Sequence, residues 1–250
     1  MWDRGIIKSN AKQALKGRYW VAYAVTLVMT LIAGGFSIII NVRDSITRSA
    51  MEIGGDPSAY FQAASEQSHP GLSLLNILFS IFVALPIVIG VARFFVQNRF
   101  GVTDFGTMFS GFRRNYINGV GAMFVTNLFI GLWTLLFIIP GIVKSLQYMM
   151  VRYILSDNPD LPGNRARELS RMLTNGEKGS IFVLILSFLG WFLLGIICLG
   201  VGTTFVVPYY EATMAELYVF LRDRAIQSGQ LNPAELGLTA PATYEPNGQE

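Results

Sequence analysis

The chain has 250 residues, of which 52% are hydrophobic and only 14% are charged, and its formal net charge is +3. Soluble domains usually carry charged side chains at about a quarter of their positions, so this composition excludes an ordinary soluble protein and indicates a chain whose main solvent is lipid. A single cysteine and a single histidine also exclude an intrachain disulfide and a zinc site built from these two residue types.

The first predicted element is an amphipathic helix near the N-terminus. Ile7, Ala11 and Leu15 recur at a four-residue spacing, which places them on one helical face. The basic ridge beside this face consists of Lys8, Lys12 and Lys16. Such a helix typically lies flat on a membrane, with its apolar face toward the lipid and its cations near the headgroups.

The same pattern returns twice along the chain. The second copy combines an apolar face with two arginines: Phe105, Met108, Phe109 and Phe112, with Arg113 and Arg114. The third copy is similar: Ala166, Leu169, Met172 and Leu173, with Arg165, Arg167 and Arg171. We interpret these segments as three repeats of an interfacial helix followed by a transmembrane hairpin. The alternative is that basic segments recur only because positive charge gathers on the cytoplasmic side of any membrane protein.

Apolar stretches long enough to cross a bilayer give the number of membrane helices. The clear stretches are residues 19–42, 72–96, 117–139 and 180–200. Residues 142–156 and 203–221 are doubtful, since each can cross or lie flat. If both cross, only Arg43, Arg48 and Lys144 of the 19 basic residues lie outside the cell, the asymmetry typical of membrane proteins. The sequence therefore predicts about six crossings, with both termini in the cytoplasm.

These patterns define the fold class and the domain organisation. We expect an all-α, polytopic transmembrane helical bundle with three cytoplasmic interfacial amphipathic helices, forming one integral membrane domain over residues 1–226. Residues 227–250 are rich in Pro, Gly, Asn and Glu and contain few large apolar side chains. Such a segment cannot bury enough surface to fold alone, so we expect a disordered cytoplasmic tail.

Two acidic residues lie inside a predicted span, Glu211 and Glu216. A carboxylate in the bilayer is costly, so each is expected to be neutral, paired or next to water. Counting about 1.5 Å per residue places Glu216 at the depth of Arg152, which predicts an intramembrane Arg152–Glu216 pair. Glu211 lies about 140° round the helix from Glu216 and faces another neighbour. It is either a structural group facing water or a carboxylate on a solute path.

Several motifs carry a resemblance to a known family. They are Ile-Pro-Gly at 139–141, Tyr-Ile-Leu-Ser-Asp-Asn-Pro at 153–159, Ser-Phe-Leu-Gly-Trp at 187–191 and Pro-Tyr-Tyr at 208–210. Over most of residues 1–226 the chain resembles the bacterial "domain of unknown function 975" family of integral membrane proteins. It is also distantly similar to the membrane domain fused to some glycerophosphodiester phosphodiesterases. The resemblance implies a bacterial cytoplasmic (plasma) membrane and a loose association with lipid chemistry, but no activity.

Three classes of function follow from these observations. We favour a non-enzymatic module that binds or organises lipid, or that assists a membrane partner protein. The residues expected to contact anionic phospholipid headgroups are Lys8, Lys12, Lys16, Arg113, Arg114, Arg165, Arg167 and Arg171. The alternative is a small-solute or ion transporter or channel that uses Glu211. An intramembrane enzyme is disfavoured because the predicted spans contain no histidine and no carboxylate pair at metal-binding spacing. We expect no cofactor, metal or nucleic acid.

Overall fold

The computed structural model describes residues 2–34, 70–197 and 200–238, and every regular element in these ranges is a helix. The α-helices are α1 (Arg4–Leu15), the helix Tyr19–Gly34, α4 (Pro70–Phe79), α5 (Leu85–Arg99), α6 (Tyr116–Leu136), α7 (Ile138–Tyr148), α8 (Val151–Asp157), α9 (Gly163–Leu173), α10 (Lys178–Ile197) and α11 (Val201–Gln227). Three short elements are the π-helical η1 (Ser80–Ala84) and the 3-10 helices η2 (Phe105–Phe112) and η3 (Pro233–Leu236). The predicted all-α class is confirmed.

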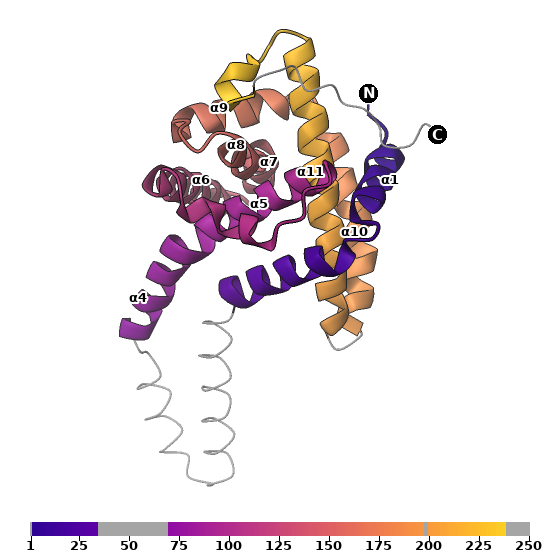
Figure 1. The fold of residues 1–250 in the computed structure, drawn as a ribbon. Coiled ribbons are helices and arrows are strands. Elements are labelled where there is room, and N and C mark those ends of the chain that lie inside the picture. Colours follow the sequence, from indigo (N-terminus) through magenta and orange to yellow (C-terminus); the bar gives the residue numbers. More distant parts are fainter. Residues whose placement is uncertain (1, 35–69, 198–199, 239–250) are drawn as a thin grey trace.

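The second half of α11 lies at the centre of the fold (Figure 1). From Glu211 to Asp223, every side chain except that of Phe220 is buried. The helices α1, α5, α9 and α10 pack against it from different directions. A helix without an exposed stripe is stable only inside such a shell of other helices. This central position makes α11 the element on which the polar contacts described below converge.

A proline interrupts the regular hydrogen bonding of the long helix formed by α4, η1 and α5. Pro86 has no N–H group, so the carbonyl of Phe82 loses its normal helical hydrogen bond. The preceding turn widens into η1, where the N–H of Leu85 donates to the carbonyl of Ser80. The hydroxyl of Tyr116, at the start of α6, donates to the freed carbonyl of Phe82 at 2.6 Å. The widened turn is therefore also the place where a hydrogen bond connects this helix to α6.

The short helix η2 lies across α5 with the two backbones in direct contact. A β-carbon added at Gly90 of α5 would collide with the carbonyl of Met108 in η2, and one added at Gly111 would collide with the carbonyl of Pro86. The Met108 side chain is fully buried in this contact region. Glycine is required at both positions because only a residue without a side chain lets two helices approach so closely.

The apolar faces of α1 and α9, which were expected to face lipid, are largely turned toward the protein, whereas that of η2 is mostly exposed. The buried residues of these faces are Ile7, Ala11 and Leu15 in α1, Met108 in η2, and Ala166, Leu169 and Leu173 in α9. Phe105, Phe109 and Phe112 of η2 remain exposed. Neighbouring helices therefore cover most of the apolar stripes of α1 and α9 but not that of η2, and the placement of the three segments at a membrane surface stays a prediction.

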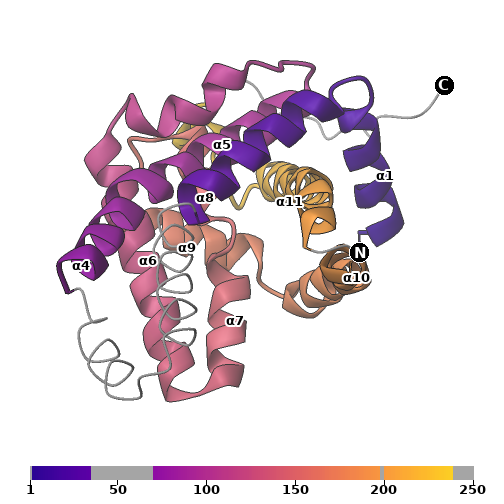
Figure 2. The same ribbon diagram turned by 90° about the horizontal axis from the view of Figure 1, so that it is seen from below.

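Three helical stretches are long and apolar enough to cross a membrane. They are Leu74–Arg99, Tyr116–Leu136 and Lys178–Ile197, and α1 together with Tyr19–Gly34 gives a fourth if this pair, bent by 99°, is one span. Figure 1 shows α10 and α11 along their length, and Figure 2 shows α6 and α7 along theirs, so these two hairpins run in different directions. Large apolar side chains are exposed on them, reaching 87% exposure at Leu135. Such surfaces require lipid or another apolar partner and indicate a membrane protein.

Neither of the doubtful stretches is one of these candidate spans. Residues 142–156 are divided between α7 and α8, which are separated at Met149 and Met150. Residues 203–221 belong to α11, which continues to Gln227. The prediction of six crossings is therefore not confirmed. Arg43, Arg48, His69 and Cys198 lie outside the described residues.

The beginning of the expected disordered tail is ordered. Leu231 and Leu236 are buried, and the backbone carbonyl of Glu235 in η3 accepts a hydrogen bond of 2.9 Å from the amide of Asn158. The prediction was wrong for residues 228–238 because the core supplies the apolar contacts that this segment cannot make alone. Residues 239–250 lie outside the described part of the chain.

Candidate functional site

The two glutamates of α11 are paired with arginines from two other helices. Glu211 lies 3.0 Å from a guanidinium nitrogen of Arg152 in α8, and Arg152 also donates to the hydroxyl of Tyr153 at 2.9 Å. Glu216 lies 2.9 Å from Nε of Arg99, the last residue of α5, and both side chains are buried. Each buried carboxylate thus has the opposite charge beside it, which offsets the cost of removing it from water.

The predicted Arg152–Glu216 pair is wrong, and the reason is the break within residues 142–156. The depth count assumed one straight helix beside α11, whereas the separation of α7 from α8 places Arg152 opposite Glu211. The two glutamates do contact different neighbours, as their angular separation on the helix predicted. Arg99 was missed as a partner because it ends an apolar stretch, where a flanking cytoplasmic charge was expected.

A third cluster joins α8 to the end of α11. Arg222 lies 3.0 Å from Asp157 and 2.9 Å from Asp223, and the hydroxyl of Tyr218 donates to Asp157 at 2.7 Å. The rings of Tyr153 and Tyr218 stack with their centroids 5.2 Å apart. Sequence reasoning missed this cluster. The available signal was the similarity between residues 153–157 and 219–223, segments that contact each other here.

These three clusters tie the core together. Within the described residues, Glu211 contacts Arg152 and Tyr153, and it lines neither of the two pockets discussed below. Among the same residues, no three His, Cys, Asp or Glu side chains are placed to hold a metal ion. The arrangement is suited to fixing helix positions.

The basic residues of α1 border an open groove of about 410 Å³. This α1 groove is lined by Lys12, Gln13, Leu15, Lys16, Gly17, Tyr19 and Tyr209. It forms because the chain turns sharply after α1, where Gly17 has a φ of +75° that favours glycine. The ammonium group of Lys12 lies 5.7 Å from the ring centroid of Tyr209, and the hydroxyl of Tyr19 donates to the carbonyl of Phe205 at 2.8 Å. Two cations thus stand at the edge of a groove with aromatic walls.

The other cations expected to meet lipid headgroups differ in their surroundings. Lys8 lies over the ring of Phe188 with its ammonium group 4.4 Å from the centroid, and Arg167 lies 5.8 Å from that of Phe129. Arg114 is paired with Asp160. Of these eight residues, the exposed cations with no ion pair or hydrogen bond from their side chains in the described structure are Lys12, Lys16, Arg113 and Arg171. The structure therefore does not bring all eight residues into one surface site.

Arg165 holds the C-terminal segment rather than standing free. Its guanidinium group contacts Glu168 at 2.8 Å and donates to Glu235 of η3 at 3.1 Å. The hydrogen bonds from Arg165 lower the pKa of the Glu235 carboxyl below its ordinary value, because they favour the ionised form. This ion pair and the two buried leucines together explain why residues 228–238 dock.

Among the comparisons with known proteins, only the one with protein-family models gives a match. No curated protein and no solved structure matches the chain. A family model described as "Protein of unknown function (DUF975)" matches residues 72–225, from the first turn of α4 to the last turns of α11. This match includes all three ion-pair clusters and covers more than half of the 250 residues. The chain therefore belongs to the DUF975 family.

Proposed function

We propose that this protein is a non-enzymatic, multi-pass protein of the bacterial cytoplasmic membrane that binds anionic phospholipid. The observation that carries the proposal is the α1 groove. Lys12 and Lys16 supply positive charge at its edge, and Leu15, Tyr19 and Tyr209 supply an apolar and aromatic wall. A phospholipid has the same two parts, a charged phosphate and an apolar chain.

The size and surroundings of the groove support this ligand. Its volume of about 410 Å³ lies within the range of small-molecule sites, roughly 300–1,000 Å³. Trp20 follows the groove residue Tyr19 in the sequence, and the carbonyl of Phe205 accepts the hydrogen bond of the Tyr19 hydroxyl. The side chains of Trp20 and Phe205 are apolar and exposed. A lipid headgroup at the lysines could therefore continue into acyl chains along these rings. Each lysine near an anionic surface adds about 1 kcal/mol of attraction.

The topology belongs to the same proposal. Six crossings, with both termini in the cytoplasm, place α1, η2 and α9 on the cytoplasmic side, where anionic lipid gathers. The distant resemblance to the membrane domain of some glycerophosphodiester phosphodiesterases agrees with a role in lipid chemistry. The transporter alternative receives less support, because Glu211 is engaged by Arg152.

Lipid binding to the full-length protein in a neutral detergent tests the groove. Short-chain phosphatidylglycerol and phosphatidylcholine would be titrated into the native protein and into a Lys12→Gln/Lys16→Gln variant. We expect the native protein to prefer phosphatidylglycerol and the variant to bind it roughly thirtyfold more weakly, since two charge interactions of about 1 kcal/mol each are lost.

The matched control is Arg4→Gln/Lys178→Gln, which removes the same charge from two residues outside the groove. It should keep the preference of the native protein. If binding weakens equally in both double variants, net charge rather than the groove decides binding. If the native protein does not prefer phosphatidylglycerol over phosphatidylcholine, the proposal is wrong. Solute uptake into proteoliposomes, lost in Glu211→Gln, would favour the transporter instead.

A further inference from the structure

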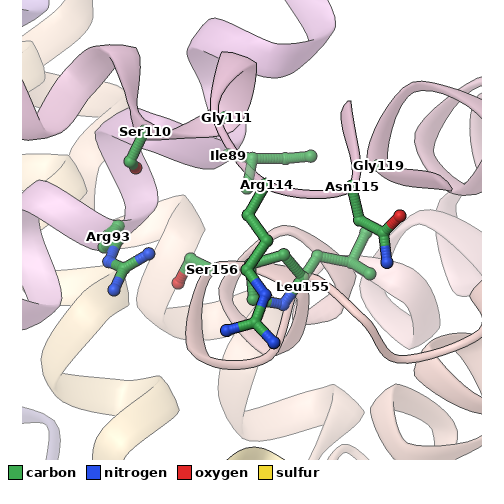
Figure 3. A pocket seen from close by; sticks show the side chains of 10 residues that line it. Ile89, Arg93, Ser110, Gly111, Arg114, Asn115, Gly119, Leu155 and Ser156 are labelled. Carbon is green, nitrogen blue, oxygen red and sulfur yellow. The ribbon is translucent and has the colours of Figure 1, made fainter. Parts of the chain in front are cut away.

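A second, smaller pocket lies where α5, η2, the start of α6 and the end of α8 meet (Figure 3). Two arginines from different segments border it, Arg93 of α5 and Arg114 before α6. Figure 3 shows the guanidinium group of Arg93 directed toward Ser156, with Ser110 above it, and the side chain of Arg114 reaching down on the other side of Ser156. None of the described residues that line the pocket is acidic. Its walls therefore offer positive charge and hydroxyl groups.

Arg93 differs from the other arginines of the core. Arg99, Arg152 and Arg222 each contact a carboxylate, whereas Arg93 is partly buried and has no hydrogen bond or ion pair in the described structure. A cation that is partly removed from water without a counter-charge is costly to hold. An anion in the pocket would offset this cost.

The remaining charges leave the pocket positive. Arg114 is exposed and is paired with Asp160, whose other carboxylate oxygen accepts a hydrogen bond of 2.6 Å from Asn115. Asp160 therefore balances one of the two arginines, and the charge of Arg93 remains. Ser110 adds a hydroxyl that makes no hydrogen bond in the described structure.

We propose that Arg93, Arg114 and Ser110 form a binding pocket for a phosphate group. Two guanidinium groups and a hydroxyl are the donors that suit a tetrahedral oxyanion. The enclosed space is only about 10 Å³, room for about one oxygen-sized group, so the remainder of the phosphate would lie beside the exposed Arg114. This excludes a large organic ligand from the depth of the pocket.

The phosphate has two sources with the same chemistry, a lipid headgroup and free inorganic phosphate. The exposed side chains of Phe112 and Ile117, which flank Arg114 in the sequence, offer a surface for acyl chains. The inference does not depend on lipid binding in the α1 groove, because inorganic phosphate has no chain to place there. Failure at one site therefore leaves the other proposal intact.

Binding to the full-length protein in neutral detergent, at constant ionic strength set with chloride, tests the pocket. Inorganic phosphate and dihexanoyl phosphatidic acid would be titrated in separate arms into the native protein and into Arg93→Gln. We expect at least one of these ligands to bind the native protein and to bind Arg93→Gln about tenfold more weakly. Binding of both ligands would mean that free phosphate is sufficient, and binding of the lipid alone would identify a headgroup site.

The control is Lys178→Gln, which removes one cation outside the pocket and should bind like the native protein. Equal affinities in the native protein and Arg93→Gln would overturn the proposal, as would the absence of binding in both arms. If Arg93→Gln does not fold, Arg114→Gln carries the test, because that side chain is 75% exposed and its loss leaves the core intact. Binding must then weaken severalfold, and unchanged affinity again overturns the inference.

Discussion

At the scale of single residues, polar groups of the core are satisfied by side chains from distant parts of the sequence. The hydroxyl of Tyr116 reaches the carbonyl of Phe82, which Pro86 leaves without its helical donor. Glu211 and Glu216 take their arginines from α8 and α5. An unpaired polar group in an apolar environment is costly, so each contact holds one helix in a fixed position relative to another.

The hydrogen bond between Tyr116 and Phe82 can be tested by removing one oxygen atom. Tyr116→Phe keeps the ring, which stacks on Phe112, but leaves the carbonyl of Phe82 without its donor. We expect the free energy of unfolding in detergent to fall by about 1 kcal/mol, measured from thermal unfolding curves. Tyr148→Phe is the control, because the Tyr148 hydroxyl makes no hydrogen bond in the described structure, and its stability should not change. A matching loss in both variants would show that the Phe82 contact contributes nothing.

At the scale of elements, the closest packing is the crossing of η2 over α5. Gly90 has no room for a methyl group beside the carbonyl of Met108, and moving η2 away would disturb the pocket residues Ser110 and Gly111. The crossing therefore sets both the stability of this region and the position of Arg93, one turn after Gly90.

Gly90→Ala tests this crossing. The added β-carbon collides with backbone, so we expect a loss of about 1–3 kcal/mol in the free energy of unfolding, the usual cost of overpacking. Gly121→Ala in α6 is the matched control, since nothing lies within 4 Å of its added β-carbon. Alanine favours helix over glycine by up to about 1 kcal/mol, so the control should be unchanged or slightly more stable. A tolerated Gly90→Ala would mean that η2 is free to move.

At the scale of the whole molecule, the proposed six-crossing topology predicts which segments lie on each side of the membrane. Six crossings place residue 175, in the exposed turn between α9 and α10, in the cytoplasm, and residue 58 outside. In a Cys198→Ser background, cysteines introduced at Asn175 and Ser58 should react with a membrane-impermeant thiol reagent from opposite sides of intact cells and inverted vesicles. Labelling of both from outside would exclude the six-crossing topology.

The sequence predicted the properties that depend on composition and periodicity. The all-α class, the position of the apolar faces on α1 and α9 and the apolar stretches from Tyr116 and Lys178 follow from the spacing of apolar residues along the chain, although the faces of α1 and α9 meet protein where lipid was expected. It did not predict which arginine meets Glu216, because that depends on the break at Met149 and on the direction in which α5 packs. Docking of Leu231 and Leu236 was missed for a similar reason: a short segment reveals its own hydrophobicity but not the surface it will meet.

The order of the ion pairs along the chain also bears on how the protein is made. Arg99 and Arg152 are synthesised before Glu211 and Glu216, the carboxylates that they pair with. By length and composition α11 is not a candidate span, so its acidic half is a poor substrate for insertion on its own. Arg99 of α5 and Arg152 of α8 are already present when α11 leaves the ribosome, and they can form ion pairs with its two glutamates. Assembly therefore finishes at the C-terminal end, and a chain that stops before α11 would leave Arg99 and Arg152 without these counter-charges.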